Sequence, residues 1–268
     1  MVGEVFRGFV RGIVLYAHFA AMNWRRITVS PVDFIIGFTA VFIQECLGLT
    51  TIVFVMRQLP SVRGWTFWEI VLIYGFFTTA RSLWHVFMIN GMDLSAYIRL
   101  GRLDRFLTRP LDPLFQIYAD GWDEDGWGEL ILGAALLFTA AINLQVNWWV
   151  RAPLLIINLV AGALVYAAII LAASSLSFWT VENDALMSLL GTLGTLGQYP
   201  LTIYGRSLQW VLSTLVPFAF VGFWPAQAFL PRTASALSYL TPLVAIALFY
   251  AAIRMFKAGL SCYQGTGT

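Results

Sequence analysis

Two long apolar runs carry polar side chains that could do chemistry inside a membrane. Thr78, Arg81 and His85 are three or four residues apart, so they share one face of a helix. Gln44 and Glu45 lie near the middle of the preceding apolar run. Ionisable side chains at this depth usually face the inside of a helix bundle or a wet cavity and find a partner there. We expect these five residues to line a translocation path or to pair within the bundle.

Glu45 and Arg81 are the obvious candidates for an ion pair. Consecutive spans run antiparallel, and the expected boundaries place the two residues ~10 Å apart in depth, a gap that long side chains partly close. The pattern favours a buried pair that fixes helix packing over a substrate contact. For a substrate contact, Arg81→Leu should lower transport and leave assembly intact, whereas failure to assemble would support the packing role.

Other chemistry is missing from the sequence. The single lysine, Lys257, is followed by Ala258, so no nucleotide-binding P-loop is present. Residues 191–197, GTLGTLG, are more typical of close helix packing than of a phosphate loop. The acidic residues 120–129, DGWDEDGWGE, lack the first and last ligands of a calcium loop and are expected to form a solvated turn. We therefore expect no catalytic residue, metal or cofactor in this chain.

The elements that must position the polar residues are membrane spans. The chain has 268 residues, of which 59% are hydrophobic and 11% charged. Several apolar runs approach the ~20 residues that a helix needs to cross a bilayer. We expect an all-α polytopic membrane protein that forms a single transmembrane domain over residues 1–268 with six spans. The expected spans are 32–56, 68–90, 129–149, 154–179, 201–222 and 238–256, the last followed by a tail to 268.

Three segments outside these spans are expected to lie at the membrane surface. Residues 1–31 should form an N-terminal interfacial helix, because its charged residues share one stripe. Residues 183–198 are expected to form an interfacial helix that leads into the fifth span. Residues 223–237, interrupted by Pro225, should form a short re-entrant hairpin on the outer face. The N-terminal stripe consists of Glu4, Arg7, Arg11, His18 and Arg25.

The cationic residues orient this arrangement. With a cytoplasmic N-terminus, eleven cations lie inside and four outside, in agreement with the positive-inside rule. Six spans then place the C-terminus in the cytoplasm as well, and residues 91–128 form the main cytoplasmic loop. The inside cations are Arg7, Arg11, Arg25, Arg26, Arg99, Arg102, Arg105, Arg109, Arg206, Arg254 and Lys257. The outside cations are Arg57, Arg63, Arg151 and Arg232.

The loop 91–128 contains an arginine-rich amphipathic segment. Asp93 or Ser95 can cap a helix that ends at Arg109, because Pro110 disfavours helical backbone in the residue before it. Asp112 and Pro113 then start a second helix. The first helix would have an apolar side of Leu100, Leu103, Phe106 and Leu107 and a basic side of Arg99, Arg102, Arg105 and Arg109. A rigid kink favours docking into a partner's groove over simple contact with anionic lipid.

The same segment resembles a known family signature. Residues 101–114, GRLDRFLTRPLDPL, are similar to the G-x-L-D-x-x-L-x-R-P-L-x-P-L run of permease subunits of type-2 ABC transporters of the exporter class. Residues 215–226, LVPFAFVGFWPA, resemble a Pro-Phe-aromatic-Pro-Ala run of these permeases, and the tail FKAGLSCYQGTGT resembles their Gly-Leu-x-x-Tyr ending. The acidic stretch 120–129 has no counterpart in the pattern.

The resemblance implies a permease that forms the path for a hydrophobic or amphipathic substrate in the bacterial cytoplasmic membrane. Its partners would be a second permease subunit, identical or paralogous, membrane lipid, and a dimer of drug-resistance-type ATPase subunits that bind ATP and magnesium; nucleic acid is not expected. Residues 93–119 would be the coupling region, residues 1–31 a connecting helix, and Phe223, Trp224 and Pro225 part of an outer gate. The implied coupling residues are Arg99, Arg102, Leu103, Asp104, Arg105, Phe106, Arg109, Pro110, Leu111, Asp112 and Pro113.

Two other function classes stay open on the sequence. A proton-coupled secondary transporter could use Glu45, Arg81 and His85 as a relay, although no convincing internal repeat is visible. An intramembrane lipid-modifying enzyme would need an interfacial cluster of His, Asp or Glu, and only the acidic loop offers one. Co-purification of an ATPase and the nucleotide dependence of transport separate these classes.

Overall fold

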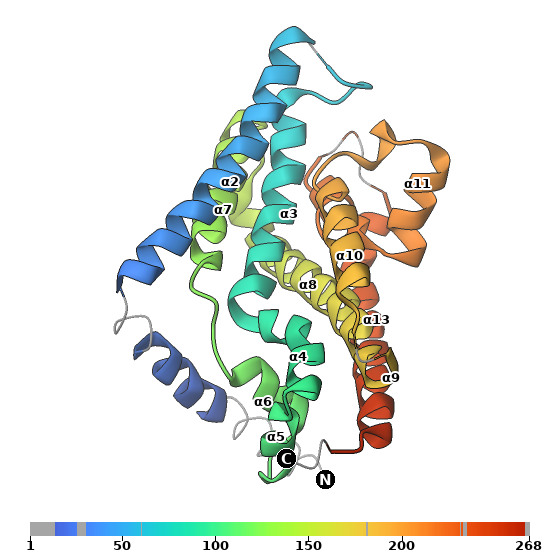
Figure 1. Cartoon of the computed structure of the whole chain (residues 1–268). Helices are drawn as coiled ribbons and strands as arrows, with labels where there is room; N and C mark the ends of the chain where they lie inside the picture. The colour runs from blue at the N-terminus through green and yellow to red at the C-terminus, as the bar shows by residue number, and fades with distance from the viewer. Residues whose placement is uncertain are drawn as a thin grey trace.

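The fold is a bundle of helices. A computed structural model describes residues 14–25, 31–59, 61–180, 182–230, 232 and 235–265 (Figure 1). Within these residues the only β-pairing is one isolated bridge, between Val62 and Trp65. Five of the described helices are long and apolar enough to cross a membrane, and a bent helix pair over residues 206–227 is a possible sixth. The expectation of an all-α polytopic membrane protein is therefore confirmed.

The long helices are α2, α3, α7, α8 and α13. They extend over Pro31–Gln58, Phe67–Met88, Gly126–Asn143, Trp148–Ser175 and Leu237–Cys262. The 3-10 helix η1 (Ile89–Asp93) and α4 (Leu94–Arg99) continue α3, and α9 (Ser177–Thr180) follows α8. Shorter helices are α5 (Arg102–Leu107), α6 (Pro113–Ala119), α10 (Asp184–Leu196), α11 (Arg206–Trp210) and α12 (Phe223–Gln227).

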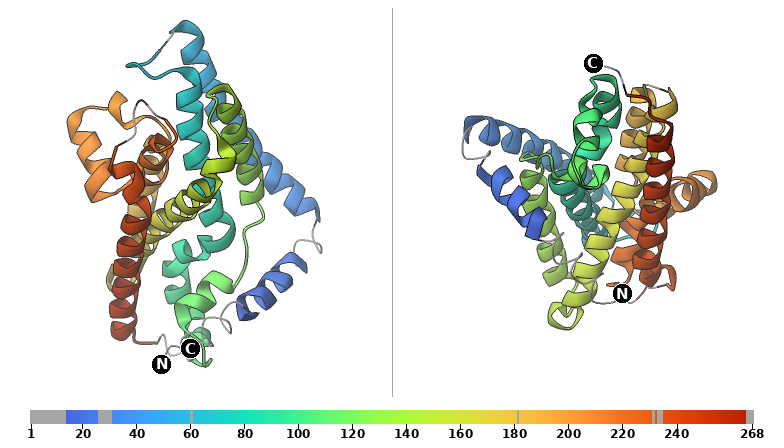
Figure 2. Two further views of the ribbon diagram at one scale, coloured as in Figure 1. Left: turned by 180° about the vertical axis from the view of Figure 1, so that it is seen from behind. Right: turned by 90° about the horizontal axis from the view of Figure 1, so that it is seen from below.

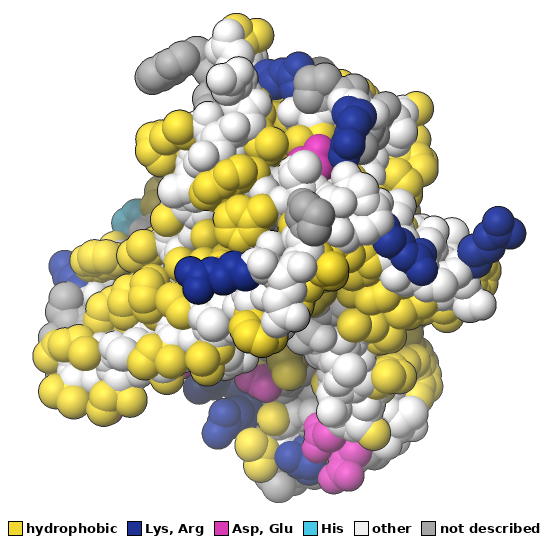
Figure 3. Space-filling model, turned by 90° about the horizontal axis from the view of Figure 1, so that it is seen from above, with side chains coloured by type: hydrophobic (Ala, Val, Ile, Leu, Met, Phe, Trp, Pro, Cys, Tyr) yellow, Lys and Arg dark blue, Asp and Glu magenta, His cyan; other side chains and the backbone are white. Residues whose placement is uncertain are grey.

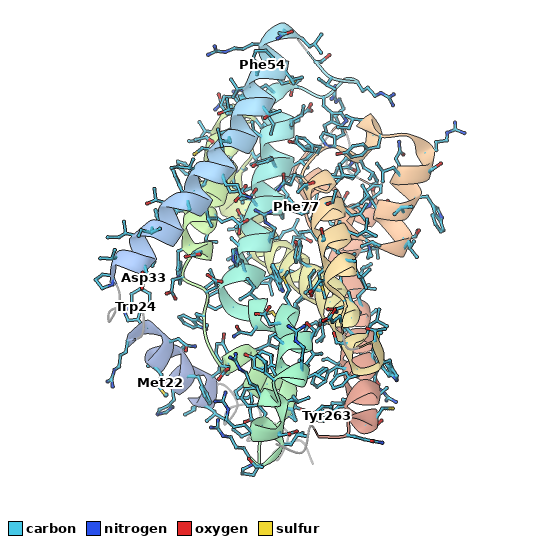
Figure 4. The ribbon with its side chains drawn as sticks, viewed as in Figure 1. Met22, Trp24, Asp33, Phe54, Phe77 and Tyr263 are labelled. Carbon is cyan, nitrogen blue, oxygen red and sulfur yellow. The ribbon has the colours of Figure 1, made fainter. Side chains whose placement is uncertain are left out.

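The centre of the bundle is α3. It packs against α7, α8 and α12, and most of its length is buried, whereas α2 lies at the outside of the bundle and is largely exposed. We call the end of the bundle that carries the 59–66 turn the upper end, and the end that carries α4, α5 and α6 the lower end (Figures 1 and 2). Figure 4 labels Phe54 near the upper end of α2, Asp33 at its lower end and Phe77 in the middle of α3.

Two features of the sequence fix α3 in place. A capping box starts the helix, since the Thr66 backbone N–H donates to the Glu69 carboxylate at 2.8 Å. Glycine then allows α7 to approach closely. A Cβ on Gly75 would lie 3.0 Å from the Leu137 backbone nitrogen, and one on Gly133 would lie 2.8 Å from that of Thr79. The α3–α7 crossing therefore depends on small residues, as is common for helices in membranes.

The boundary between the third and fourth long helices, α7 and α8, lies earlier in the chain than expected. The predicted spans 129–149 and 154–179 place a boundary near Arg151, but α7 ends at Asn143 and α8 begins at Trp148. The turn between them contains Gln145 in left-handed conformation, with φ of 53°. This backbone geometry cannot continue a helix, and Pro153, expected to precede the fourth span, lies inside α8.

The predicted fifth span is bent. Residues 201–222 do not form one helix, because Arg206–Leu215 and Phe218–Gln227 meet at an angle of 74°. Pro217 lies at the bend and has no backbone N–H to continue a helix. Instead, α10 runs from the lower end beside α9 up to the segment that contains α11 (Figure 1). We infer that α10, expected to be interfacial, makes the fifth crossing and that the bent pair, rather than 223–237 alone, is the re-entrant element.

Arg206 therefore lies at the opposite end of the bundle from the one expected. The Trp65 indole N–H donates to the Thr202 hydroxyl at 2.7 Å, and Arg63 donates to the Thr202 carbonyl oxygen at 3.1 Å. Residues 201–206 therefore lie at the upper end beside the 59–66 turn, which corrects the expectation that Arg206 shares a side with Arg99. The remaining bias of cations toward the lower end still follows the positive-inside rule.

The glycine-rich segment of α10 is used partly for packing. A Cβ on Gly197 would lie 2.7 Å from the Phe77 ring, and one on Gly194 would contact Tyr166, whereas Gly191 has open space around it. Residues 14–25 form a helix as expected, but the residues Glu4, Arg7 and Arg11 of the predicted stripe lie outside the described part of the chain.

Candidate functional site

A buried ionic network joins α2, α3 and α7. Arg81 of α3 donates through one guanidinium nitrogen to the carboxylates of Glu45 on α2 and Glu129 on α7. The Tyr74 hydroxyl adds a hydrogen bond to Glu45 Oε2 at 2.9 Å. The expected pairing of Glu45 with Arg81 is thus present, and the predicted ~10 Å offset in depth is bridged by side-chain length and helix tilt.

Glu129 is the member of the network that the sequence reading missed. The sequence predicts that it lies in a solvated acidic turn, but only 1% of its surface is exposed. Its second carboxylate oxygen is 3.1 Å from Nδ1 of His85, so it contacts two side chains of α3. Gly126 and Gly133 are seven residues apart, and Glu129 lies three residues after the first of them, so all three share one face of α7. The two glycines mark this face as the packed one, and this spacing is the signal that places Glu129 there.

The network continues from His85 toward an acidic cavity at the lower end. His85 Nε2 lies 3.7 Å from Asp123 Oδ2. The cavity has a volume of about 440 Å³ and is lined by Asp33, Trp122, Asp123, Glu124 and Asp125, among others. Burial raises the pKa of the Asp125 carboxyl, and the neighbouring Asp123 raises it further, whereas His85 opposes the shift. The acidic loop is therefore a structural part of the bundle and not a free turn.

Two other predicted polar residues do not join the network. Gln44 is exposed on α2, whereas its neighbour Glu45 is buried. Thr78 is fully buried in α3, and its hydroxyl has no hydrogen-bond partner. Of the five intramembrane candidates, the structure brings together Glu45, Arg81 and His85.

At the lower end, the predicted helix from residue 93 to 109 is divided. α4 ends at Arg99 and α5 begins at Arg102, because Gly101 adopts a left-handed conformation with φ of 65°. Glycine takes this conformation at little cost, whereas other residues rarely do. α5 then ends at Leu107, two residues before the expected terminus.

Only half of the expected apolar side is buried. Leu103 and Phe106 are 0% and 1% exposed, but Leu100 and Leu107 are 57% and 46% exposed. The division at Gly101 rotates α5 relative to α4, so a single apolar stripe no longer forms. The exposed tip that results contains Leu100, Arg102, Arg105, Leu107, Thr108, Arg109 and Pro110.

A buried amide holds this tip. Asp112 caps α6 as expected, since its side chain accepts from the Phe115 N–H at 3.1 Å. The Gln116 side chain, which the sequence reading did not single out, donates to the carbonyl oxygens of Phe106 at 2.8 Å and Leu111 at 3.0 Å. Because Gln116 is 2% exposed, it fixes both ends of the turn that contains Arg109 and Pro110.

We expect Gln116→Leu to loosen this turn. The substitution keeps approximately the same volume but leaves two carbonyl oxygens without their donor, which should lower the free energy of unfolding by ~1–3 kcal/mol. Thermal unfolding of the detergent-solubilised chain measures the loss. Thr108→Ala, which removes an exposed hydroxyl that donates to the Arg105 carbonyl oxygen, is the control and should have a much smaller effect. Equal unfolding temperatures for the two variants would contradict the prediction.

The tip is tied to the membrane helices through a second hydrophobic cluster. Leu103 and Phe106 of α5 and Leu114 of α6 belong to the same buried cluster as Leu171 of α8 and Phe256 of α13. Salt bridges at its surface join Arg99 to Glu182 at 3.0 Å and Arg105 to Asp120 at 3.7 Å. The tip is therefore packed directly against α8 and α13.

The helix of residues 14–25 packs on the same region. The Trp122 indole N–H donates to the Tyr16 hydroxyl at 3.1 Å, and the Tyr16 and Phe19 rings lie 6.3 and 6.2 Å from that of Phe115. Trp24, labelled in Figure 4, makes an edge contact with Trp127 at 6.4 Å. The N-terminal helix therefore contacts both α6 and the acidic loop.

The residues expected at an outer gate lie in α12 at the upper end. The Phe223 ring is 5.8 Å from that of Trp65 and 5.0 Å from that of Trp224. Phe223 and Pro225 are buried, and the Trp224 indole N–H has no hydrogen-bond partner. Through Phe223 and Trp65, the second half of the bent helix pair packs against the 59–66 turn.

Comparison with known proteins gives one match. The model of a family described as ABC-2 family transporter protein matches residues 42–267, most of the chain. No curated protein matches the chain, and no solved structure does. The matched region begins three residues before Glu45 and includes the whole ionic network and the exposed tip.

Proposed function

From the premise that this chain belongs to the ABC-2 family of transporter proteins, we propose that it is the permease subunit of an ATP-driven exporter. It carries a hydrophobic or amphipathic substrate across the bacterial cytoplasmic membrane, and both chain termini lie in the cytoplasm. A separate ATPase dimer binds ATP and magnesium, and a second permease subunit, identical or paralogous, completes the translocation path together with Phe223, Trp224 and Pro225 at its outer end.

The observation that carries this proposal is the construction of the exposed tip at the lower end. Its arginines are exposed, its backbone is held by Gln116, and its buried side chains reach α8 and α13. A surface helix that only contacted lipid would need none of this rigidity. We propose that the tip, with the rest of residues 93–119, docks into a groove of the ATPase and passes its motion to the membrane helices.

Charge reversal at the tip tests this proposal. We expect Arg102→Glu combined with Arg105→Glu to weaken association with the ATPase at least about tenfold, because like charges across an interface cost several kcal/mol. The measurement is the amount of ATPase that co-purifies with the tagged permease from the native membrane. Asp123→Ala with Asp125→Ala is the control, because these residues lie in the acidic cavity beside His85. Equal recovery of the ATPase by both variants would refute docking at the tip.

A second candidate function is proton-coupled transport, which the ionic network favours. Arg81, Glu129 and His85 form a chain of polar contacts that leads from the buried Glu45 toward the acidic cavity. In that case transport in vesicles would require a pH gradient and no nucleotide. Transport that stops when ATP is withheld, in the presence of the same gradient, would eliminate this candidate.

A further inference from the structure

An apolar pocket opens beside the 59–66 turn at the upper end. Its walls include Ile52, Val55 and Met56 of α2, Val62 of the turn, Ile70 of α3, and Tyr199, Pro200, Ile203 and Tyr204. Its volume is about 300 Å³. This is the lower limit of the ~300–1,000 Å³ range of small-molecule pockets, so the space suits one narrow chain and not a bulky molecule.

Two hydroxyl groups of the pocket wall are already used within the protein. The Thr51 hydroxyl donates to the Leu47 carbonyl oxygen at 3.2 Å, and the Tyr204 hydroxyl donates to the Leu196 carbonyl oxygen at 2.9 Å. An occupant therefore gains little from polar groups inside the pocket. Burial of apolar surface, worth ~25 cal/mol per Å², is the interaction that the wall offers.

One wall of the pocket belongs to the most exposed of the long helices near the upper end. α2, which forms one wall, is largely exposed along its length, and Phe54 and Val55 near its upper end are 65% and 40% exposed. Figure 4 shows Phe54 at this end of α2. A lipid chain in the leaflet beside the upper end can reach such an opening from the side.

Three arginines flank the pocket in the sequence. Arg57 directly follows Met56, Arg63 directly follows Val62, and Arg206 is two residues beyond Tyr204. All three are exposed, and in the part of the chain that the structure describes none forms an ion pair with a carboxylate. Figure 3 looks onto this end of the molecule and shows cationic side chains spread across it.

Arg63 is held in an unusual conformation. Its φ is 49°, in the left-handed region, and its guanidinium donates to the Thr202 carbonyl oxygen at 3.1 Å. The contact ties the 59–66 turn to the segment whose residues Pro200, Ile203 and Tyr204 form the opposite wall of the pocket. With Gly64, whose φ is 86°, Arg63 forms the two central residues of a tight turn between the paired residues Val62 and Trp65.

We propose that this pocket binds one acyl chain of an anionic phospholipid, whose phosphate lies among Arg57, Arg63 and Arg206. The apolar wall selects the chain, and the unpaired cations select the charge of the headgroup. The proposal does not depend on coupling to an ATPase, because it concerns only the upper end of this chain.

Photolabelling in vesicles tests the proposal. The full chain is reconstituted in phosphatidylcholine vesicles that contain a trace of phosphatidylglycerol or phosphatidylcholine with the same photoreactive acyl chain. Mass spectrometry measures adducts on residues 52–56 and 199–204, and adducts on Ile35 and Ile43, two exposed residues of α2, provide the bulk-lipid reference. We expect the pocket to be labelled above the reference and the phosphatidylglycerol probe to be favoured at least about fivefold.

Variants separate the role of the arginines from that of the wall. Arg57→Gln, Arg63→Gln and Arg206→Gln should each lower the preference for the anionic probe by about fivefold, since one cation near the surface contributes roughly that factor. Arg254→Gln at the lower end of α13 is the matched control. Met56→Trp should fill the pocket and reduce labelling by both probes to the reference level.

Three results would overturn the proposal. Equal labelling of the wild-type pocket by both probes would show that headgroup charge is not recognised. Pocket labelling at the reference level would show that no chain is bound. Cross-links between two copies of the chain through residues 52–56, without lipid adducts, would identify the pocket as a contact between permease subunits.

Discussion

Replacement of Arg81 by leucine should prevent stable assembly of the bundle. The substitution leaves two buried carboxylates, those of Glu45 and Glu129, with no guanidinium between them. Removal of one partner of a buried ion pair typically costs ~3–5 kcal/mol, because the remaining charge is left uncompensated. Since Arg81 joins α2 and α7 through α3, the loss should appear as aggregation in size-exclusion chromatography and as a lower unfolding temperature.

A charge-matched variant is the control for this prediction. Glu45→Gln and Glu129→Gln added to Arg81→Leu remove the unpaired charges and should recover most of the stability. Recovery of assembly without recovery of transport would show that the network also acts in translocation. If Arg81→Leu alone assembled normally and failed only in transport, the packing role would be refuted and a substrate contact favoured.

Gly133→Ala should destabilise the crossing of α3 and α7, although alanine is the better helix former. The added Cβ would lie 2.6 Å from the Thr79 hydroxyl oxygen and 2.8 Å from the Thr79 backbone nitrogen. Backbone atoms cannot yield as a flexible side chain does, so the helices must separate, and overpacking of this kind costs ~1–3 kcal/mol. Separation would also pull Glu129, four residues earlier in α7, away from Arg81.

Gly191→Ala is the matched control on α10. Nothing lies within 4 Å of a Cβ at this position, so only the gain in helix propensity, up to ~1 kcal/mol, should remain. Unfolding temperatures of the two variants should therefore shift in opposite directions. A stabilised Gly133→Ala protein would mean that α3 and α7 are not packed as closely as described.

The fold class follows from the sequence because hydropathy reports composition directly. Pro31–Gln58 and Leu237–Cys262 are mostly apolar, and both have the length that a span requires. The path of the chain between Thr180 and Leu237 does not follow in this way. Residues 201–222 have the length of a span but bend at Pro217, whereas α10, rich in glycine and threonine, forms a continuous helix beside the bundle.

The ionic network was only partly predictable for a related reason. The spacing of Arg81 and His85 is visible in the sequence, and Glu45 is conspicuous in an apolar run. Glu129 lies in a stretch of acidic residues that looks solvated, and only the early start of α7 at Gly126 carries it into the bundle. Gln116 gives no signal, because its two acceptors are backbone carbonyl oxygens whose positions depend on the division at Gly101.

The short length of α10 has a consequence for the surrounding lipid. At 1.5 Å per residue its 13 residues extend only ~20 Å, whereas the hydrocarbon layer of a bilayer is ~30 Å thick. A mismatch of this kind is relieved by local thinning of the membrane at a cost of fractions of a kcal/mol per Å. The two leaflets should therefore approach each other beside α10, and an amphipathic molecule that crosses there would have the shortest apolar distance to travel.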